Sequence, residues 1–127
     1  MAKYVIQSTE GAPPAGAYSQ GWRAGDFIYV TGTGPMGQDG AIVGDTIEEQ
    51  TLRTIDNIET ILRADGATLA DVIKVTVHLS DVGQFPQYNE AYKSRFSEPY
   101  PVRTTVGSVL PMAGMLVEID CVAYVGG

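Results

Sequence analysis

The stretch DTIEEQTLRTIDNIETILRADG, residues 45–66, predicts the clearest helix of the chain and so decides its fold class. Apolar and small side chains recur in it at three- and four-residue spacing, on one face of a helix: Ile47, Thr51, Ile55, Ile58 and Leu62. We expect Asp45 to cap the first turn, with Glu48 three residues on as its reciprocal partner. Gly66 stands where a left-handed residue ends a helix. The stretch therefore predicts one helix with a single buried stripe.

Alternating and β-rich runs on both sides of this helix predict a sheet. In residues 71–79, one face carries Ile73, Val75, Val77 and Leu79, and the other carries Lys74, Thr76 and His78. Before the helix, strands are expected at 4–6, 19–23 and 27–30, with a hairpin turn at Gly25-Asp26. After it, a second helix is expected at 86–96. Residues 102–109 and 115–125 then predict a wide hairpin or two nearby strands around 110–114.

This order, β-β-β-α-β-α-β-β, predicts a single α+β domain over residues 1–127, with both helices on one face of a mixed sheet. The other face then carries Lys74, Thr76 and His78 beside apolar neighbours. It either meets water, as antiparallel sheets often do, or packs on another subunit. We favour the subunit, because small chains commonly bury a sheet face by symmetric association.

The composition excludes several classes of protein. The chain has 127 residues, with Lys+Arg 8 and Asp+Glu 15, and a net charge of −7. A general nucleic-acid binder would need clustered basic residues, so no nucleic-acid partner is expected. One Cys and one His cannot form an internal disulfide or a Cys/His zinc site. With no leader-like segment and no apolar run of about 20 residues, we expect a reduced, cytoplasmic protein without membrane contact.

Two stretches match catalytic or cofactor motifs but lack the required context. Residues 32–37, GTGPMG, fit the dinucleotide fingerprint, yet no helix pattern follows until Asp45. Residues 17–21, AYSQG, resemble a nucleophile elbow, but β-type residues follow. The only His, His78, is expected to be a half-buried structural residue. Neither a nucleotide cofactor nor serine-hydrolase chemistry is predicted.

Arg103 and Glu118 are the charges most worth explaining, because each lies in an otherwise apolar β-rich run. A hairpin centred on Leu110-Pro111 would place them opposite or nearly opposite each other. One interpretation is then a cross-strand ion pair. The other is a site in which Arg103 clamps a ligand carboxylate and Glu118 handles a proton or water. Asn89, a poor residue for the middle of a helix, points to a polar site or an inter-subunit hydrogen bond nearby.

A series of motifs along nearly the whole chain is similar to the Rid (YjgF) family. The motifs are Gly16–Gln20 (GAYSQ), Val30–Gly32 (VTG), Glu49–Thr51 (EQT) with Asn57-Ile58, Asp71–Thr76 (DVIKVT), Phe85 with Asn89 and Tyr92, Pro101–Thr104 (PVRT), and Leu110-Pro111 followed by Val117–Ile119 (VEI). The resemblance implies a chorismate-mutase-like α+β domain that forms homotrimers, with ligand sites between subunits. It also implies hydrolysis of enamines and imines such as 2-aminoacrylate to 2-keto acids and ammonia, without a metal or other cofactor.

Carried over by position, the resemblance assigns substrate carboxylate binding to Arg103 and proton and water chemistry to Glu118. The implied substrate-binding positions are Tyr18, Thr31, Gly32, Asn89 and Thr105. Thr31 stands where Ser is usual, and Thr105 where well-studied deaminases have Cys. These departures leave open a pathway-specific deaminase, for example of a 2-aminomuconate-like substrate. A ligand-binding regulatory trimer without turnover is a further alternative, and ribonuclease activity is disfavoured by the negative charge.

Overall fold

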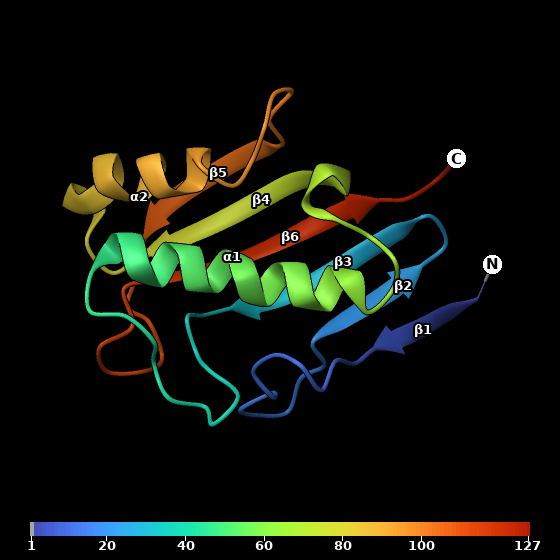
Figure 1. The fold of residues 1–127 in the computed structure, drawn as a ribbon, viewed down its shortest axis with the longest axis horizontal. Helices are drawn as coiled ribbons and strands as arrows, with labels where there is room; N and C mark the ends of the chain where they lie inside the picture. Colours follow the sequence, from blue (N-terminus) through green and yellow to red (C-terminus); the bar gives the residue numbers. More distant parts are fainter. Residues whose placement is uncertain (1) are drawn as a thin grey trace.

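The structure, a computed structural model, describes residues 2–127 as six strands, two α-helices and two short 3₁₀ helices (Figure 1). The strands are β1 (Lys3–Ile6), β2 (Gly21–Ala24), β3 (Phe27–Thr33), β4 (Val72–Leu79), β5 (Val102–Gly107) and β6 (Val117–Tyr124). The helices are α1 (Ile47–Arg63) and α2 (Phe85–Lys93), with 3₁₀ turns η1 (Leu69–Asp71) and η2 (Val82–Gln84). The predicted order of strands and helices is confirmed.

The six strands form one mixed sheet in the order β1-β2-β3-β6-β4-β5. Only β4 and β5 pair in parallel, and the other neighbours are antiparallel. The predicted hairpin of β5 and β6 is therefore wrong, because β4 lies between them. A parallel pair needs a long crossover, and the segment from Leu79 to Val102, which includes α2, supplies it. The apolar strand β4 thereby gains a hydrogen-bonded neighbour on each edge.

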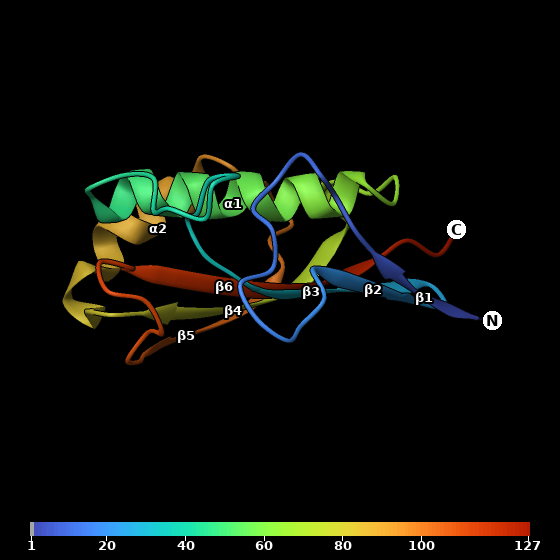
Figure 2. The same cartoon turned by 90° about the horizontal axis from the view of Figure 1, so that it is seen from below.

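Both helices cover the same face of the sheet, as predicted (Figure 2). Between the two layers lies the apolar core, in which the α2 aromatics Tyr88 and Tyr92 and the following Phe96 are all buried. The predicted inward position of Ile73 is wrong. A register shift between Val72 and Lys74 places Val72 in the core and leaves Ile73 45% exposed.

The start of α1 is defined by polar residues one position later than the sequence predicts. Thr46 is the N-cap: its side chain accepts a hydrogen bond from the amide of Glu49, and the Glu49 carboxylate accepts one from the amide of Thr46. The predicted pair of Asp45 and Glu48 is wrong, because Thr46 forms the complete reciprocal box. Gly66 adopts the predicted left-handed conformation, with a φ of 77°.

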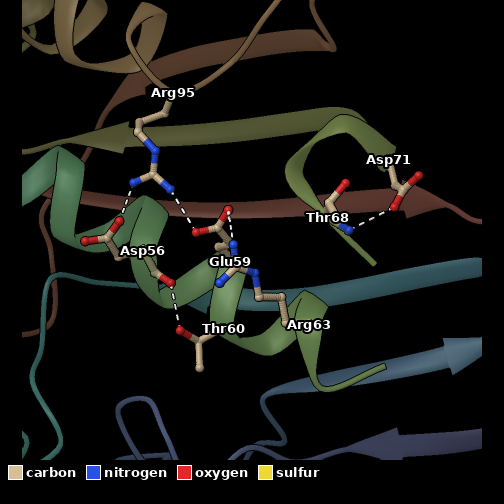
Figure 3. A network of polar contacts seen from close by, with 7 residues as sticks. All are labelled: Asp56, Glu59, Thr60, Arg63, Thr68, Asp71 and Arg95. Atoms are coloured by element: carbon tan, nitrogen blue, oxygen red, sulfur yellow. Dashed lines mark hydrogen bonds and ion pairs between the residues drawn. The ribbon is translucent and has the colours of Figure 1, made fainter. Parts of the chain in front are cut away.

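A polar network joins α1 to the segment that follows α2 (Figure 3). The guanidinium of Arg95 donates to Asp56 and to Glu59, the latter at 3.0 Å. Glu59 also pairs with Arg63 one turn along α1, at 3.4 Å. These charges hold the end of α2 against α1, and so fix the helix that supplies Asn89.

The face of the sheet away from the helices, the lower face in Figure 2, has no helix of the described chain over it. Large, partly exposed side chains lie on this face. Trp22 and Tyr29 are directly paired across β2 and β3 and are 41% and 50% exposed. Phe27 and Tyr124 are paired across β3 and β6, with ring centroids 5.3 Å apart. No helix of residues 2–127 covers this face, so it is the apolar surface available to a partner.

Candidate functional site

Arg103 lies near the start of the edge strand β5 and points to the helix-covered face of the sheet. It pairs in register with the buried Val75 of β4, which fixes that direction. Its Nη1 donates to Asn89 Oδ1 at 2.9 Å and to the Tyr88 hydroxyl at 3.4 Å. The polar role predicted for Asn89 is thus filled by the guanidinium of Arg103. Among residues 2–127, no carboxylate forms an ion pair with Arg103.

Three aromatic rings surround the Arg103 guanidinium. Its Cζ lies 4.6 Å from the ring centroid of Tyr92, 5.4 Å from that of Phe85 and 5.6 Å from that of Tyr88. Burial raises the pKa of the Tyr88 hydroxyl, and the charge of Arg103 opposes that rise, so the phenol stays neutral. The cation therefore has aromatic faces and neutral polar groups around it, and the part of the chain that the structure describes gives it no counter-ion.

A cavity of about 400 Å³ opens beside this guanidinium, hereafter the Arg103 cavity. Its lining residues are Asn89, Tyr92, Lys93, Tyr100, Pro101 and Arg103. A guanidinium that lines a cavity and is partly shielded from water can bind a planar anion there. A carboxylate fits best, because it accepts two parallel hydrogen bonds from the guanidinium N–H groups.

Glu118 lies on the opposite face of the sheet. Its neighbours along β6, Val117 and Ile119, are fully buried under the helices, so the alternation of the strand turns Glu118 away from them. It lines a second cavity of about 540 Å³, hereafter the Glu118 cavity. The other lining residues are Ala15, Tyr18, Thr31, Gly32, Met36, Pro111, Met112 and Met115.

A bulge in β3 brings the backbone at Thr31 and Gly32 into the Glu118 cavity. Val30 pairs with Cys121 but Thr33 pairs with Ile119, so two residues of β3 face a single residue of β6. A Cβ added at Gly32 would lie only 3.1 Å from Glu118 Oε1. Glycine at this position therefore leaves room for the carboxylate of Glu118.

Tyr18 lines the Glu118 cavity from the loop between β1 and β2. Its hydroxyl accepts a hydrogen bond from the amide of Ala15 at 2.9 Å, and 44% of the residue is exposed. The loop itself is held by Gln20, whose side chain donates to the carbonyl of Ala12 at 2.9 Å. The phenol thus lies at the rim of the cavity, within reach of a ligand.

Within one chain the predicted residues divide into two groups. Tyr18, Thr31 and Gly32 share a cavity with Glu118, whereas Asn89 lies with Arg103. Arg103 and Glu118 flank β4 on opposite sides, three residues apart along it and on opposite faces, so their Cα atoms are about 14 Å apart. The expectation that they lie opposite each other in a hairpin is wrong, and so is the cross-strand ion pair that it allowed.

Thr105 and His78 line neither cavity. The Thr105 hydroxyl is buried without a hydrogen-bond partner among residues 2–127, two residues beyond Arg103 on the same face. His78 Nδ1 lies 2.7 Å from the Ser108 hydroxyl, which supports the structural interpretation of that histidine. Residues 32–37 lead into a loop instead of a helix, so the dinucleotide motif is correctly rejected.

Sequence reasoning missed two sets of lining residues. Tyr92 is a buried core residue, and its ring also lies against the Arg103 guanidinium, a role that its helical spacing does not indicate. No motif in the sequence points to the methionines that line the Glu118 cavity: Met36, Met112 and Met115. Each lies in a segment that contains glycine and proline, residues 32–37 or 110–115. Their shared position depends on the pairing of β3 with β6, which spacing alone does not indicate.

Between residues 2 and 127, no group of three or more His, Cys, Asp or Glu side chains is arranged to hold a metal ion. Over the same range, no helix combines the length and the apolar character needed to cross a bilayer.

Comparisons with known proteins give a consistent result. Residues 9–125 match the family described as endoribonuclease L-PSP. A RutC family protein of Pyrococcus abyssi is 42% identical over 98% of this chain and 98% of its own length. A 2-iminobutanoate/2-iminopropanoate deaminase of Dermatophagoides farinae is 31% identical over 98% of this chain and 99% of its own. The crystal structure of a putative endoribonuclease from Thermotoga maritima superposes with a TM-score of 0.91, at 32% identity over 98% of each chain.

Proposed function

This chain belongs to the endoribonuclease L-PSP family, the Rid (YjgF) family that its motifs resemble, and we propose that it is an enamine/imine deaminase. Its substrates are 2-aminoacrylate and related 2-imino acids, and its products are 2-keto acids and ammonia. The observation that carries the proposal is the Arg103 guanidinium, held beside a cavity with no carboxylate partner among residues 2–127. A substrate carboxylate is the missing partner.

The chemistry requires few groups, because an imine carbon is already electrophilic. An enamine such as 2-aminoacrylate first takes up a proton at its terminal carbon and becomes the imine. Arg103 binds the carboxylate through paired N–H donors, supported by Asn89. Glu118 accepts a proton from water as the water oxygen forms a bond to the imine carbon. Glu118 then passes this proton to the nitrogen of the carbinolamine. As the C–N bond breaks and ammonia leaves, the hydroxyl group loses its proton to Glu118 and becomes the carbonyl of the 2-keto acid.

The two cavities can serve one substrate only if two copies of the chain meet, so we include a homotrimer in the proposal. Arg103 and Glu118 are on opposite faces of the sheet in one copy. The exposed apolar face around Trp22, Tyr29 and Tyr124 supports burial against a second copy. Closed cyclic symmetry then builds equivalent sites, each with Arg103 of one copy and Glu118 of the next. The number three comes from the family resemblance.

The assembly is tested by mixing two inactive variants, Arg103→Ala and Glu118→Gln. After joint dissociation and reassembly at equal amounts, about a quarter of the shared sites combine an intact Arg103 with an intact Glu118. Activity is therefore expected to return to about a quarter of the wild-type value, in trimers identified by native mass. No recovery in confirmed mixed trimers would show that each site lies within one chain.

The activity itself is tested by release of ammonia and pyruvate from 2-aminoacrylate that a separate enzyme generates in the assay. The expected result is faster release than the spontaneous hydrolysis, lost in Glu118→Gln. A protein that binds 2-keto acids without accelerating the release would instead be a ligand-binding regulator. A specialised deaminase would show turnover with an unsaturated amino acid such as 2-aminomuconate and little with 2-aminoacrylate.

Ribonuclease activity, to which the family's name refers, is disfavoured for this chain by its charge. The net charge is −7, and of its 8 Lys and Arg residues four are paired with carboxylates: Arg23, Arg63, Lys93 and Arg95. RNA binding needs free basic groups along the phosphate backbone. We therefore propose small carboxylated imines as substrates, without a nucleic-acid partner or a cofactor, and a cytoplasmic location.

A further inference from the structure

Three methionine side chains line the Glu118 cavity, and the proposed reaction gives them no role. Met115 is 4% exposed, Met36 is half-buried and Met112 is 36% exposed, so they extend from the interior to the surface. The side chains of Met36 and Met115 lie against Gly34, where an added Cβ would collide with both methyl groups. Methionine is flexible and polarisable, and it adapts to apolar ligands of varied shape.

Buried amides of α1 fix the segments that carry these methionines. Gln50 Nε2 donates to the carbonyl of Gly114 at 2.9 Å, and Gln50 Oε1 accepts from the amide of Leu116 at 2.8 Å, so Met115 is held from both sides. Asn57 Nδ2 donates to the carbonyls of Gly34 at 2.9 Å and of Met36 at 2.8 Å.

Gln50 and Asn57 are only 2% and 4% exposed, and they lie two turns apart on one face of α1. Their hydrogen bonds tie the β3–α1 loop and the β5–β6 loop to the same rigid helix. The surface formed by Met36, Met112 and Met115, hereafter the methionine wall, is therefore a preformed part of the cavity.

The chemistry of the lining limits what this wall can contact. Among residues 2–127, Glu118 is the only charged residue that lines the cavity, and the methionines with Pro111 and Ala15 offer no strong hydrogen-bonding side chain. In a 2-imino acid, the carbon attacked by water carries three substituents: the carboxylate, the nitrogen and the side chain. Arg103 of the neighbouring copy takes the first and Glu118 serves the reacting centre, so the side chain is left for the methionine wall.

We propose that Met36, Met112 and Met115 form a specificity subsite for an apolar substrate side chain larger than the methyl group of 2-iminopropanoate. The preferred substrates are then imines of long-chain apolar amino acids, of which the leucine-derived imine is the representative. The inference rests on the proposed deamination. A cavity of about 540 Å³ has ample room for such a side chain beside the reacting carbon.

The experiment compares two imines produced in the assay from alanine and leucine by an amino-acid oxidase. The quantity measured is kcat/KM for their hydrolysis above the spontaneous rate. In apolar pockets one methylene changes kcat/KM by roughly 10–200-fold. Because a flexible wall discriminates less sharply, we expect a preference of about 10-fold for the leucine-derived imine. A ratio of one or below would overturn the subsite.

Substitutions at the exposed Met112 test whether the wall causes the preference. Met112→Gln keeps the length but adds a polar amide, and is expected to lower the ratio about fivefold. Met112→Leu stays apolar and should keep the ratio within about twofold. The matched control is Val109→Gln, because Val109 lies in the same β5–β6 segment, is 99% exposed and lines neither cavity. An unchanged ratio in Met112→Gln, or an equal loss in Val109→Gln, would contradict the proposal.

A binding measurement separates failure of this inference from failure of the proposed function. If neither imine is hydrolysed, deamination is refuted, and calorimetric binding of pyruvate and of 4-methyl-2-oxopentanoate decides the subsite. Tighter binding of the longer acid, reduced in Met112→Gln, supports the subsite without turnover. Equal affinities, or no binding of either acid, would overturn it.

Discussion

Replacing Gly32 by alanine tests how closely the reaction depends on the position of Glu118. The new Cβ would lie 3.1 Å from Glu118 Oε1 and 3.2 Å from its Cδ, which is tighter than an ordinary contact. Gly32 is not among the glycines with positive φ, so its backbone accepts alanine. The side chain of Glu118 therefore has to give way, by a few tenths of an ångström.

The two expected effects of Gly32→Ala have opposite consequences. At a compatible backbone position, Gly→Ala stabilises the folded state by about 0.4–1 kcal/mol, because it restricts the unfolded chain. The close contact offsets part of this gain, so the free energy of unfolding should change by less than about 1 kcal/mol. A misplacement of about 1 Å can lower catalysis about 100-fold. A smaller displacement of the Glu118 carboxylate is expected to reduce kcat about 10-fold, or about 1.4 kcal/mol.

The assay measures kcat for imine hydrolysis together with the thermal midpoint. The control is Gly37→Ala, whose Cβ would meet the Asp39 carboxylate at 3.3 Å and which lines no part of the Glu118 cavity. Full kcat in Gly32→Ala would refute the role given to Glu118. A parallel fall of kcat and midpoint in both variants would mean that the loop is destabilised and the site is not specifically affected.

Arg103→Lys should lower kcat/KM for carboxylated imines about 30- to 150-fold, equivalent to about 2–3 kcal/mol, because an ammonium group cannot reproduce the paired donors of the guanidinium. Near-wild-type kinetics would exclude carboxylate binding at this residue. Burial raises the pKa of Asp120. The folded state then binds this proton more tightly than the unfolded state, so stability is lost as the pH rises through the raised pKa. Asp120→Asn should therefore raise the thermal midpoint at pH 7 but not near pH 3, and an equal shift at both pH values would contradict this. Burial raises the pKa of the Cys121 thiol to about 12; a thiol reagent at pH 8 should label Cys121 only after unfolding, and rapid labelling of the native protein would show that the thiol is accessible.

Sequence periodicity predicted the order of elements because each helix and strand has one buried face of its own. The stripe on α1 and the alternation of β4 required no knowledge of the rest of the chain. The cap was placed one residue early, since Asp45 and Thr46 both satisfy the pattern and only the backbone decides between them. Ile73 was misplaced because a bulge in β4 reverses the alternation there.

Pairing between strands was harder to predict than the strands themselves. β5 and β6 are neighbours in sequence. A hairpin between two such strands costs the least conformational entropy, because its connecting loop is the shortest. In the structure the apolar strand β4 pairs with both of them, and its own side chains Val75, Val77 and Leu79 are fully buried there. This single choice moves Arg103 from a position opposite Glu118 to the other face of the sheet. The sequence thus predicted both strands but not the strand pairing that separates these two side chains.

The position of Arg103 and Glu118 on opposite faces of the sheet has a chemical consequence for the proposed reaction. Had Arg103 and Glu118 faced each other in one hairpin, they would have neutralised each other, and a substrate carboxylate would have had to displace Glu118 to bind. On opposite faces, Arg103 is held by Asn89 and the Tyr92 ring without a carboxylate partner among residues 2–127, while the Glu118 carboxylate lies beside Gly32. In the proposed assembly, the contact between copies would bring Arg103 and Glu118 together only where a substrate lies between them, so that the substrate carboxylate would not have to displace Glu118.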